Sequence, residues 1–210
     1  MDTASPRRTG GDQVEVACAC VSRAKVGQSP IIAVPPFFLL FIPSDLVRHS
    51  AARVIAAIAS NEFSHSTWPQ LLPYLIETCT SNDVKHREVG IYIIYAVLEA
   101  IAEGFEPHLA NLFTTFQLLL VDPESLEVRI TAVKAVGVLA QYVDVEDKND
   151  LVRGSGWQFP NDITYVCQRS IQSMLPAVFQ VIGQTVESGN ESGARQLFDV
   201  LETLLILVRG

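Results

Sequence analysis

Three apolar segments of the chain begin with the same arrangement, an Arg followed three positions later by a small residue. The arginines are Arg48, Arg87 and Arg129, and the small residues are Ala51, Gly90 and Ala132. Apolar residues follow six, seven and ten positions after each Arg, which places them on one helical face. The arginines are 39 residues (48 to 87) and 42 residues (87 to 129) apart. This interval is close to the roughly 40–47 residues of a HEAT or armadillo unit, so the sequence predicts stacked helix pairs.

A second kind of helix is predicted between these segments. Residues 66–81 offer Thr67 as an N-cap with Gln70 three positions later, which is a capping box. Residues 106–123 begin with a Pro in the first turn and end before Pro123. Asp122 is then the expected N-cap of the third Arg-led helix, with Pro123 at its first position. Two kinds of helix therefore alternate, and the predicted fold class is all-α.

The domain organisation predicted from the sequence has two parts. Residues 1–43 form an irregular segment of uncertain fold, and residues 44–210 form about four helical repeats. The polar stretch 144–162 is acidic at its start and contains Gly, so it predicts a loop inserted into the array. A long helix from 163 to 187 should kink or break at Pro176. The last apolar run shows no end signal, so we expect a fragment of a longer array.

Composition limits the possible partners and compartments. The net charge is −8 and no Lys/Arg cluster follows Arg7 and Arg8, which argues against nucleic-acid binding and favours basic protein partners. The four Cys form no C-x-x-C pair, as expected of a reduced intracellular protein. The apolar run 30–43 is about 14 residues long and broken by prolines, whereas a membrane span needs about 20. We therefore expect no membrane span.

The sequence carries no motif of enzyme or metal chemistry. It lacks the phosphate-binding, dinucleotide-binding, zinc-protease and nucleophile-elbow motifs, and no His has a spaced metal partner. We therefore expect no catalytic residue, no metal site, no cofactor and no enzyme activity.

The candidate site residues are partner-binding ones. Trp68 opens a helix of the second kind and could be an exposed anchor, or it could staple the turn between two helices. Asp144, Glu146, Asp147 and Asp150 could attract basic cargo, or they could belong to an inert solvated loop.

Three motifs carry a resemblance to a known family. They are A-x-x-I-A-x-I-A at 52–59, W-P-x-L-L-P-x-L at 68–75 and H-R-E at 86–88. Together they resemble the N-terminal HEAT repeats of the karyopherin-β (importin-β) nuclear transport receptors. Residues 174–205 resemble further repeats, notably in the branch that includes importins for histones and ribosomal proteins. The resemblance covers about residues 45–209.

The resemblance implies a HEAT-repeat α-solenoid, a right-handed superhelix of antiparallel helix pairs. It implies a nuclear import receptor that binds cargo on the face lined by the helices starting at Trp68, Pro107 and about Ile163. The implied partners are the GTPase Ran in its GTP form, basic cargo such as histones or ribosomal proteins, and nucleoporins. The implied location is the cytoplasm and nucleus, including the nuclear pore and envelope. The alternative is a HEAT-repeat scaffold or adaptor outside nuclear transport, similar to phosphatase scaffold subunits.

Overall fold

The computed structural model describes residues 45–63, 71–101, 105, 107–153 and 161–209. The predicted irregular segment 1–43 therefore lies outside the described residues, as do Thr67 and Trp68. The chain divides into two compact units, residues 1–48 and 49–210. Of the first unit, only the beginning of one helix is described, so the account below concerns the second unit.

The described residues form helices and no strand. The helices are α3 (Asp45–Phe63), α4 (Leu71–Cys79), α5 (Val84–Ile101), α6 (Leu109–Leu120), α7 (Leu126–Arg153), α8 (Asn161–Glu187) and α9 (Glu191–Arg209). Each predicted helical segment contains one of them, which confirms the all-α prediction. Among the described residues, no helix is both long enough and apolar enough to cross a bilayer.

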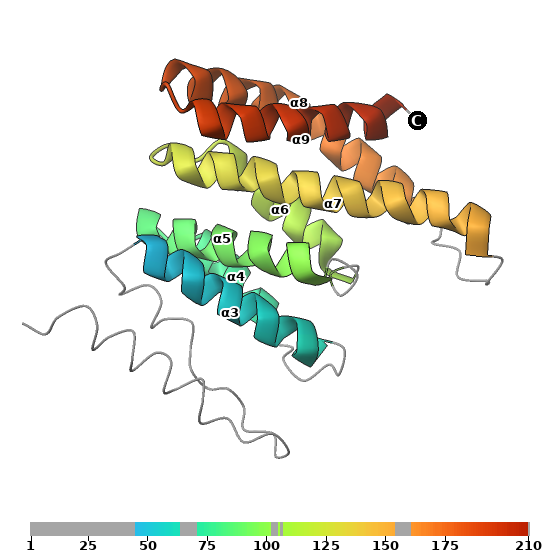
Figure 1. Cartoon of the computed structure of the whole chain (residues 1–210), viewed down its shortest axis with the longest axis horizontal. Helices are drawn as coiled ribbons and strands as arrows, with labels where there is room; N and C mark the ends of the chain where they lie inside the picture. The colour runs from blue at the N-terminus through green and yellow to red at the C-terminus, as the bar shows by residue number, and fades with distance from the viewer. Residues whose placement is uncertain (1–44, 64–70, 102–104, 106, 154–160, 210) are drawn as a thin grey trace, which may run out of the picture. The chain divides into compact units, whose positions relative to one another are not determined.

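The helices of the second unit are stacked in two layers (Figure 1). Helices α5, α7 and α9 lie side by side in one layer, and α4, α6 and α8 follow one another in the other. The His49 ring of α3 stacks on Tyr92 of α5, with ring centroids 3.8 Å apart, so α3 joins the first layer. We call these the A layer (α3, α5, α7, α9) and the B layer (α4, α6, α8). The alternation confirms the predicted HEAT-repeat solenoid.

Close approach between the layers depends on a glycine that the repeat pattern singled out. A Cβ atom added to Gly90 would lie 2.9 Å from Cys79 Sγ and 3.1 Å from the Cys79 backbone N. Helix α5 therefore packs on the end of α4 at a distance that only Gly allows. The matching small residue Ala132 is fully buried, whereas Ala51 is only half-buried. The predicted role of the small residue is confirmed at Gly90.

A second close approach joins two A-layer helices and was not predicted. A Cβ atom added to Gly137 of α7 would lie 2.7 Å from the side chain of Val200 on α9. The sequence signal was a single Gly inside a helical pattern, which often marks such a contact. Gly137 therefore faces the next helix of its own layer.

The predicted loop from 144 to 162 is wrong over most of its length. Helix α7 continues to Arg153, and α8 already includes residues 161 and 162. The stretch 144–153 contains neither Gly nor Pro, so its polar composition offers no backbone reason to end a helix. Only residues 154–160 can form the connection, and these lie outside the described residues.

The predicted break at Pro176 does not occur, because α8 is helical from 161 to 187. Pro176 and Gln172 are both exposed, so the Gln172 carbonyl that loses its helical donor can be hydrated instead. The predicted cap at Gly189 is confirmed, with φ of 74° and its N–H donating to the Val186 carbonyl at 3.0 Å. A left-handed Gly thus ends α8 and turns the chain into α9.

Candidate protein-binding surfaces

The structure describes the predicted partner-binding residues only in part. Trp68 lies outside the described residues. Asp144, Glu146, Asp147 and Asp150 lie in the C-terminal part of α7, where the backbone is helical and the side chains are not described. They therefore share one helix instead of a loop, and their attraction for basic ligands stays a prediction.

The repeated Arg has a structural role that the sequence did not specify. Arg87 Nη1 donates to the carbonyls of Ser81 (2.9 Å) and Asn82 (3.1 Å), in the turn between α4 and α5. Its Nε donates to Asp122 Oδ2 at 2.6 Å, and its Nη2 donates to Glu124 Oε2 at 3.1 Å. Asp122 and Glu124 lie in the turn between α6 and α7. Arg87 therefore links two successive turns of the array, and it is not free to bind a ligand.

Asp122 caps a turn instead of the helix that it was predicted to start. Its Oδ1 accepts from the backbone N–H groups of Glu124 (3.0 Å) and Ser125 (2.8 Å). The helix begins three residues later, at Leu126, and the Ser125 hydroxyl accepts from the Val128 N–H at 3.2 Å. The predicted N-cap is therefore wrong, because Asp122 is held by Arg87 and by its own turn.

A second Arg of the repeat pattern reaches the same turn. Arg129 Nη1 donates to the backbone carbonyl of Asp122. Arg87 and Arg129 therefore converge on one short segment, one on its side chain and the other on its main chain.

The electrostatics of this turn predict an acid sensitivity. Burial would raise the pKa of Asp122, but the Arg87 guanidinium and the two backbone N–H groups outweigh it and hold the pKa below its usual value. A carboxyl with a lowered native pKa stabilises the fold above its unfolded pKa of about 4 and loses this contribution as pH falls further. Asp122→Asn should therefore be less stable than the parent at pH 6, and urea unfolding should show the gap shrinking between about pH 4 and pH 2.5. A gap independent of pH would show that the Asp122 carboxylate does not provide this stability.

The outward side of the B layer is polar and nearly uncharged. Helix α6 has no charged residue and exposes Asn111, Thr114 and Gln117. Gln117 Nε2 donates to Ser173 Oγ of α8 at 3.2 Å, so the two helices meet at this surface. We call these four residues the B-layer surface. It offers hydrogen bonds and little charge, which suits contacts with a protein backbone or polar side chains.

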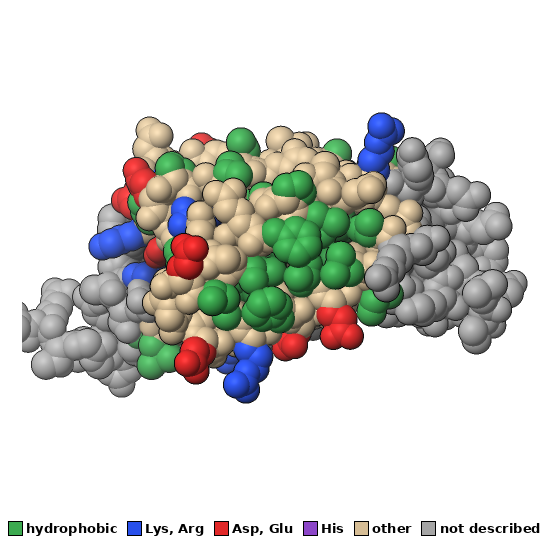
Figure 2. All heavy atoms as spheres, turned by 90° about the horizontal axis from the view of Figure 1, so that it is seen from above, with side chains coloured by type: hydrophobic (Ala, Val, Ile, Leu, Met, Phe, Trp, Pro, Cys, Tyr) green, Lys and Arg blue, Asp and Glu red, His purple; other side chains and the backbone are tan. Residues whose placement is uncertain are grey.

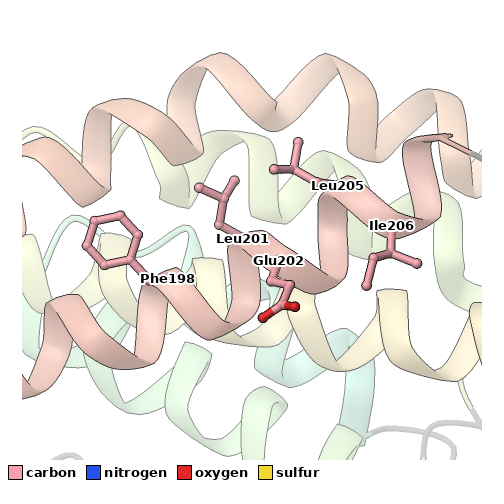
Figure 3. A pocket seen from close by; sticks show the side chains of 5 residues that line it. All are labelled: Phe198, Leu201, Glu202, Leu205 and Ile206. Atoms are coloured by element: carbon pink, nitrogen blue, oxygen red, sulfur yellow. The ribbon is translucent and has the colours of Figure 1, made fainter.

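An apolar face lies on α9, at one end of the described array. Its members are Phe198, Leu201, Glu202, Leu205 and Ile206, which line a shallow groove (Figure 3). Phe198 and Ile206 are each 53% exposed. Figure 2, which views the array from the side of α8 and α9, shows apolar side chains gathered in one area. We call this set the α9 face, and sequence reasoning did not identify it.

The described residues show binding surfaces and no reactive constellation. They contain no group of three or more His, Cys, Asp or Glu side chains placed to hold a metal ion. Cys79 and Cys167 are buried, and burial raises the pKa of the Cys167 thiol to about 11. Both thiols are therefore core residues, as predicted, and they are protonated at neutral pH.

Comparison with known proteins gives a consistent set of matches. The family model described as "IPO5-like, TPR repeats" matches residues 43–155. The "Probable importin-5 homolog" of Dictyostelium discoideum is 26% identical over 156 residues, which cover 73% of this chain and 13% of that protein. The "Probable importin subunit beta-4" of Schizosaccharomyces pombe is 30% identical over 59 residues, which cover 28% of this chain and 6% of that protein. The chain thus spans a small part of the length of these relatives.

The repeat length agrees with HEAT units more than with the tetratricopeptide units in the family description. A tetratricopeptide unit has about 34 residues, whereas HEAT and armadillo units have about 40–47. Helices α5 and α7 begin at Val84 and Leu126, 42 residues apart. Both kinds of unit are stacked helix pairs, so the match and the two-layer fold agree on architecture.

Proposed function

The chain belongs to the IPO5-like importin family, and from this premise we propose that it is a nuclear import receptor, or part of one, that binds cargo and Ran-GTP. The observation that carries the proposal is that the family match, residues 43–155, coincides with the stacked helices α3 to α7. A stacked array of this kind presents an extended surface to protein partners. The role is one of binding, and it requires no catalytic group.

The B-layer surface is the proposed site of cargo contact. Asn111, Thr114 and Gln117 are exposed along α6, and Ser173 continues the surface on α8. Trp68, at the predicted start of the first B-layer helix, would add an aromatic anchor. We further propose that the receptor moves between cytoplasm and nucleus and contacts nucleoporins at the nuclear pore.

Nucleotide-dependent binding of Ran tests the receptor role. The purified chain should bind Ran loaded with a non-hydrolysable GTP analogue at least about tenfold more tightly than Ran-GDP, a difference of about 1.4 kcal/mol. Surface plasmon resonance with immobilised chain would measure both affinities. Equal affinities would contradict the proposal and favour the alternative, a HEAT-repeat scaffold, because a scaffold has no reason to sense the nucleotide.

The acidic residues of α7 are the proposed attraction for basic cargo. A variant that neutralises all four should bind a histone dimer about tenfold more weakly at low salt, and the difference should shrink at high salt because salt screens such attraction. The changes are Asp144→Asn, Glu146→Gln, Asp147→Asn and Asp150→Asn.

A matched control neutralises four exposed acidic residues elsewhere on the array. The changes are Glu77→Gln, Glu127→Gln, Glu187→Gln and Glu191→Gln. The control changes net charge equally, so an equal loss of histone affinity would show only a general charge effect and would contradict a specific role for α7.

A further inference from the structure

The A-layer helices share a set of apolar positions that α9 leaves uncovered. Counted from the first residue of each helix, these are the eighth, eleventh and fifteenth positions. In α5 and α7 they are at most 1% exposed, and the residues are Ile91, Ile94, Leu98, Val133, Val136 and Ala140. In α9 they are Phe198, which is 53% exposed, Leu201, which is half-buried, and Leu205, which is 39% exposed. The same apolar stripe is thus covered twice and exposed once.

The twelfth position shows what covers the stripe in the internal helices. In α7 this position is Gly137, which contacts Val200 of α9 closely enough that a Cβ atom would lie 2.7 Å away. This side of an A-layer helix therefore faces the next A-layer helix. In α9 the twelfth residue is Glu202, which is exposed within the apolar groove (Figure 3). A helix in the corresponding place would cover Glu202.

We propose that the α9 face docks a further helix pair of the same repeat kind, whose first helix lies along α9 as α9 lies along α7. That helix must present an apolar stripe to Phe198, Leu201 and Leu205. It must also carry a Lys or Arg opposite Glu202, because a carboxylate that loses water on docking is costly unless a cation meets it. The surface therefore selects its neighbour by charge as well as by apolar contact.

A second copy of the chain is a poorer occupant of the α9 face than a foreign helix pair. A symmetric dimer through this face would bring one Glu202 close to the other, and each chain carries a net charge of −8. The apolar stripe would gain cover, but the two carboxylates would lose water without a cation between them. The charge at the centre of the face therefore favours a basic partner helix.

A pair of designed peptides tests the charge requirement. Each is a two-helix hairpin whose first helix has Leu at positions i, i+3 and i+7, and the residue placed opposite Glu202 is Lys in one and Glu in the other. Fluorescence anisotropy with the full chain should show the Lys peptide binding at least about tenfold more tightly. With Glu202→Lys, the order of the two peptides should reverse.

Surface variants separate this face from the rest of the molecule. Phe198→Ser and Leu205→Ser should each weaken the Lys peptide at least about tenfold, whereas Leu118→Ser removes an exposed apolar side chain from α6 and should have no effect. Circular dichroism checks that each variant keeps its helical content. Equal binding of the two peptides, or the absence of saturable binding to folded chain, would overturn the proposal. A dimer that Phe198→Ser dissociates, with no peptide binding, would identify a second copy as the occupant instead.

The result is independent of the receptor role. Ran-GTP affinity should be the same in the parent chain and in Phe198→Ser. Peptide binding without any Ran preference would contradict the proposed function and leave the docking surface supported.

Discussion

Replacing Arg87 by Met should lower the free energy of unfolding by about 3 kcal/mol. The Arg87 side chain is 11% exposed and that of Asp122 is 3% exposed, so the change leaves a buried carboxylate without its cation. It also removes the donors to the Ser81 and Asn82 carbonyls, while Met keeps most of the apolar stem in place. Urea unfolding followed by circular dichroism at pH 7 would measure the loss.

Lys85→Met is the matched control for Arg87→Met. Lys85 is an exposed cation in the first turn of the same helix, so its replacement should change stability by less than about 0.5 kcal/mol. If the two variants were equally stable, Arg87 would not link the turns in solution.

Replacing Gly90 by Ala should lower the free energy of unfolding by about 2 kcal/mol. The new methyl group would lie 2.9 Å from Cys79 Sγ and 3.1 Å from the Cys79 backbone N, and the backbone of α4 can yield only by moving away from α5. This cost exceeds the gain of about 1 kcal/mol that Ala normally brings to a helix interior. Thermal or urea unfolding would report the difference.

Gly183→Ala provides a control of the opposite sign. Gly183 is also inside a helix, but no atom lies within 4 Å of the position that its Cβ would take. The change should therefore raise stability by about 0.5–1 kcal/mol through helix propensity alone. A stabilised Gly90→Ala variant would contradict the close packing of α4 and α5.

The Arg87 link and the Gly90 contact also bear on the proposed binding surface. Both act between elements that are neighbours in the array, and both set how far one helix pair lies from the next. The spacing of the B-layer helices, and hence of Asn111, Thr114 and Gln117 relative to Ser173, depends on these contacts. Variants that loosen them should therefore be tested for cargo affinity as well as for stability.

The sequence alone was sufficient for the helices, their alternation and the repeat. Helical periodicity is a local property, since residues three and four apart share a face wherever the helix packs. The Arg-led segments and the glycine cap at Gly189 were therefore found without the structure. The importin resemblance rested on the same local motifs and agrees with the family match over residues 43–155.

Helix ends were predicted less well, for a physical reason. The polar stretch after residue 144 and Pro176 both weaken a helix locally, yet α7 and α8 continue through them. Neither effect is large enough to end a helix whose backbone remains hydrogen-bonded and whose apolar side is packed. Of the predicted site residues, Trp68 and the four acidic residues of α7 remain predictions.

Only the tertiary structure decided which residues meet across the array. Asp122 is 35 residues from Arg87 in the sequence, and no local pattern pairs them. The α9 face was equally hidden, because Phe198 and Leu205 follow the same spacing as the buried Ile91 and Leu98, and the sequence pattern does not show whether a neighbour covers them. The sequence by itself determined the repeating unit, since that depends on local periodicity. The stacking of the units decided which apolar and charged side chains are matched by a neighbour and which stay available to a partner.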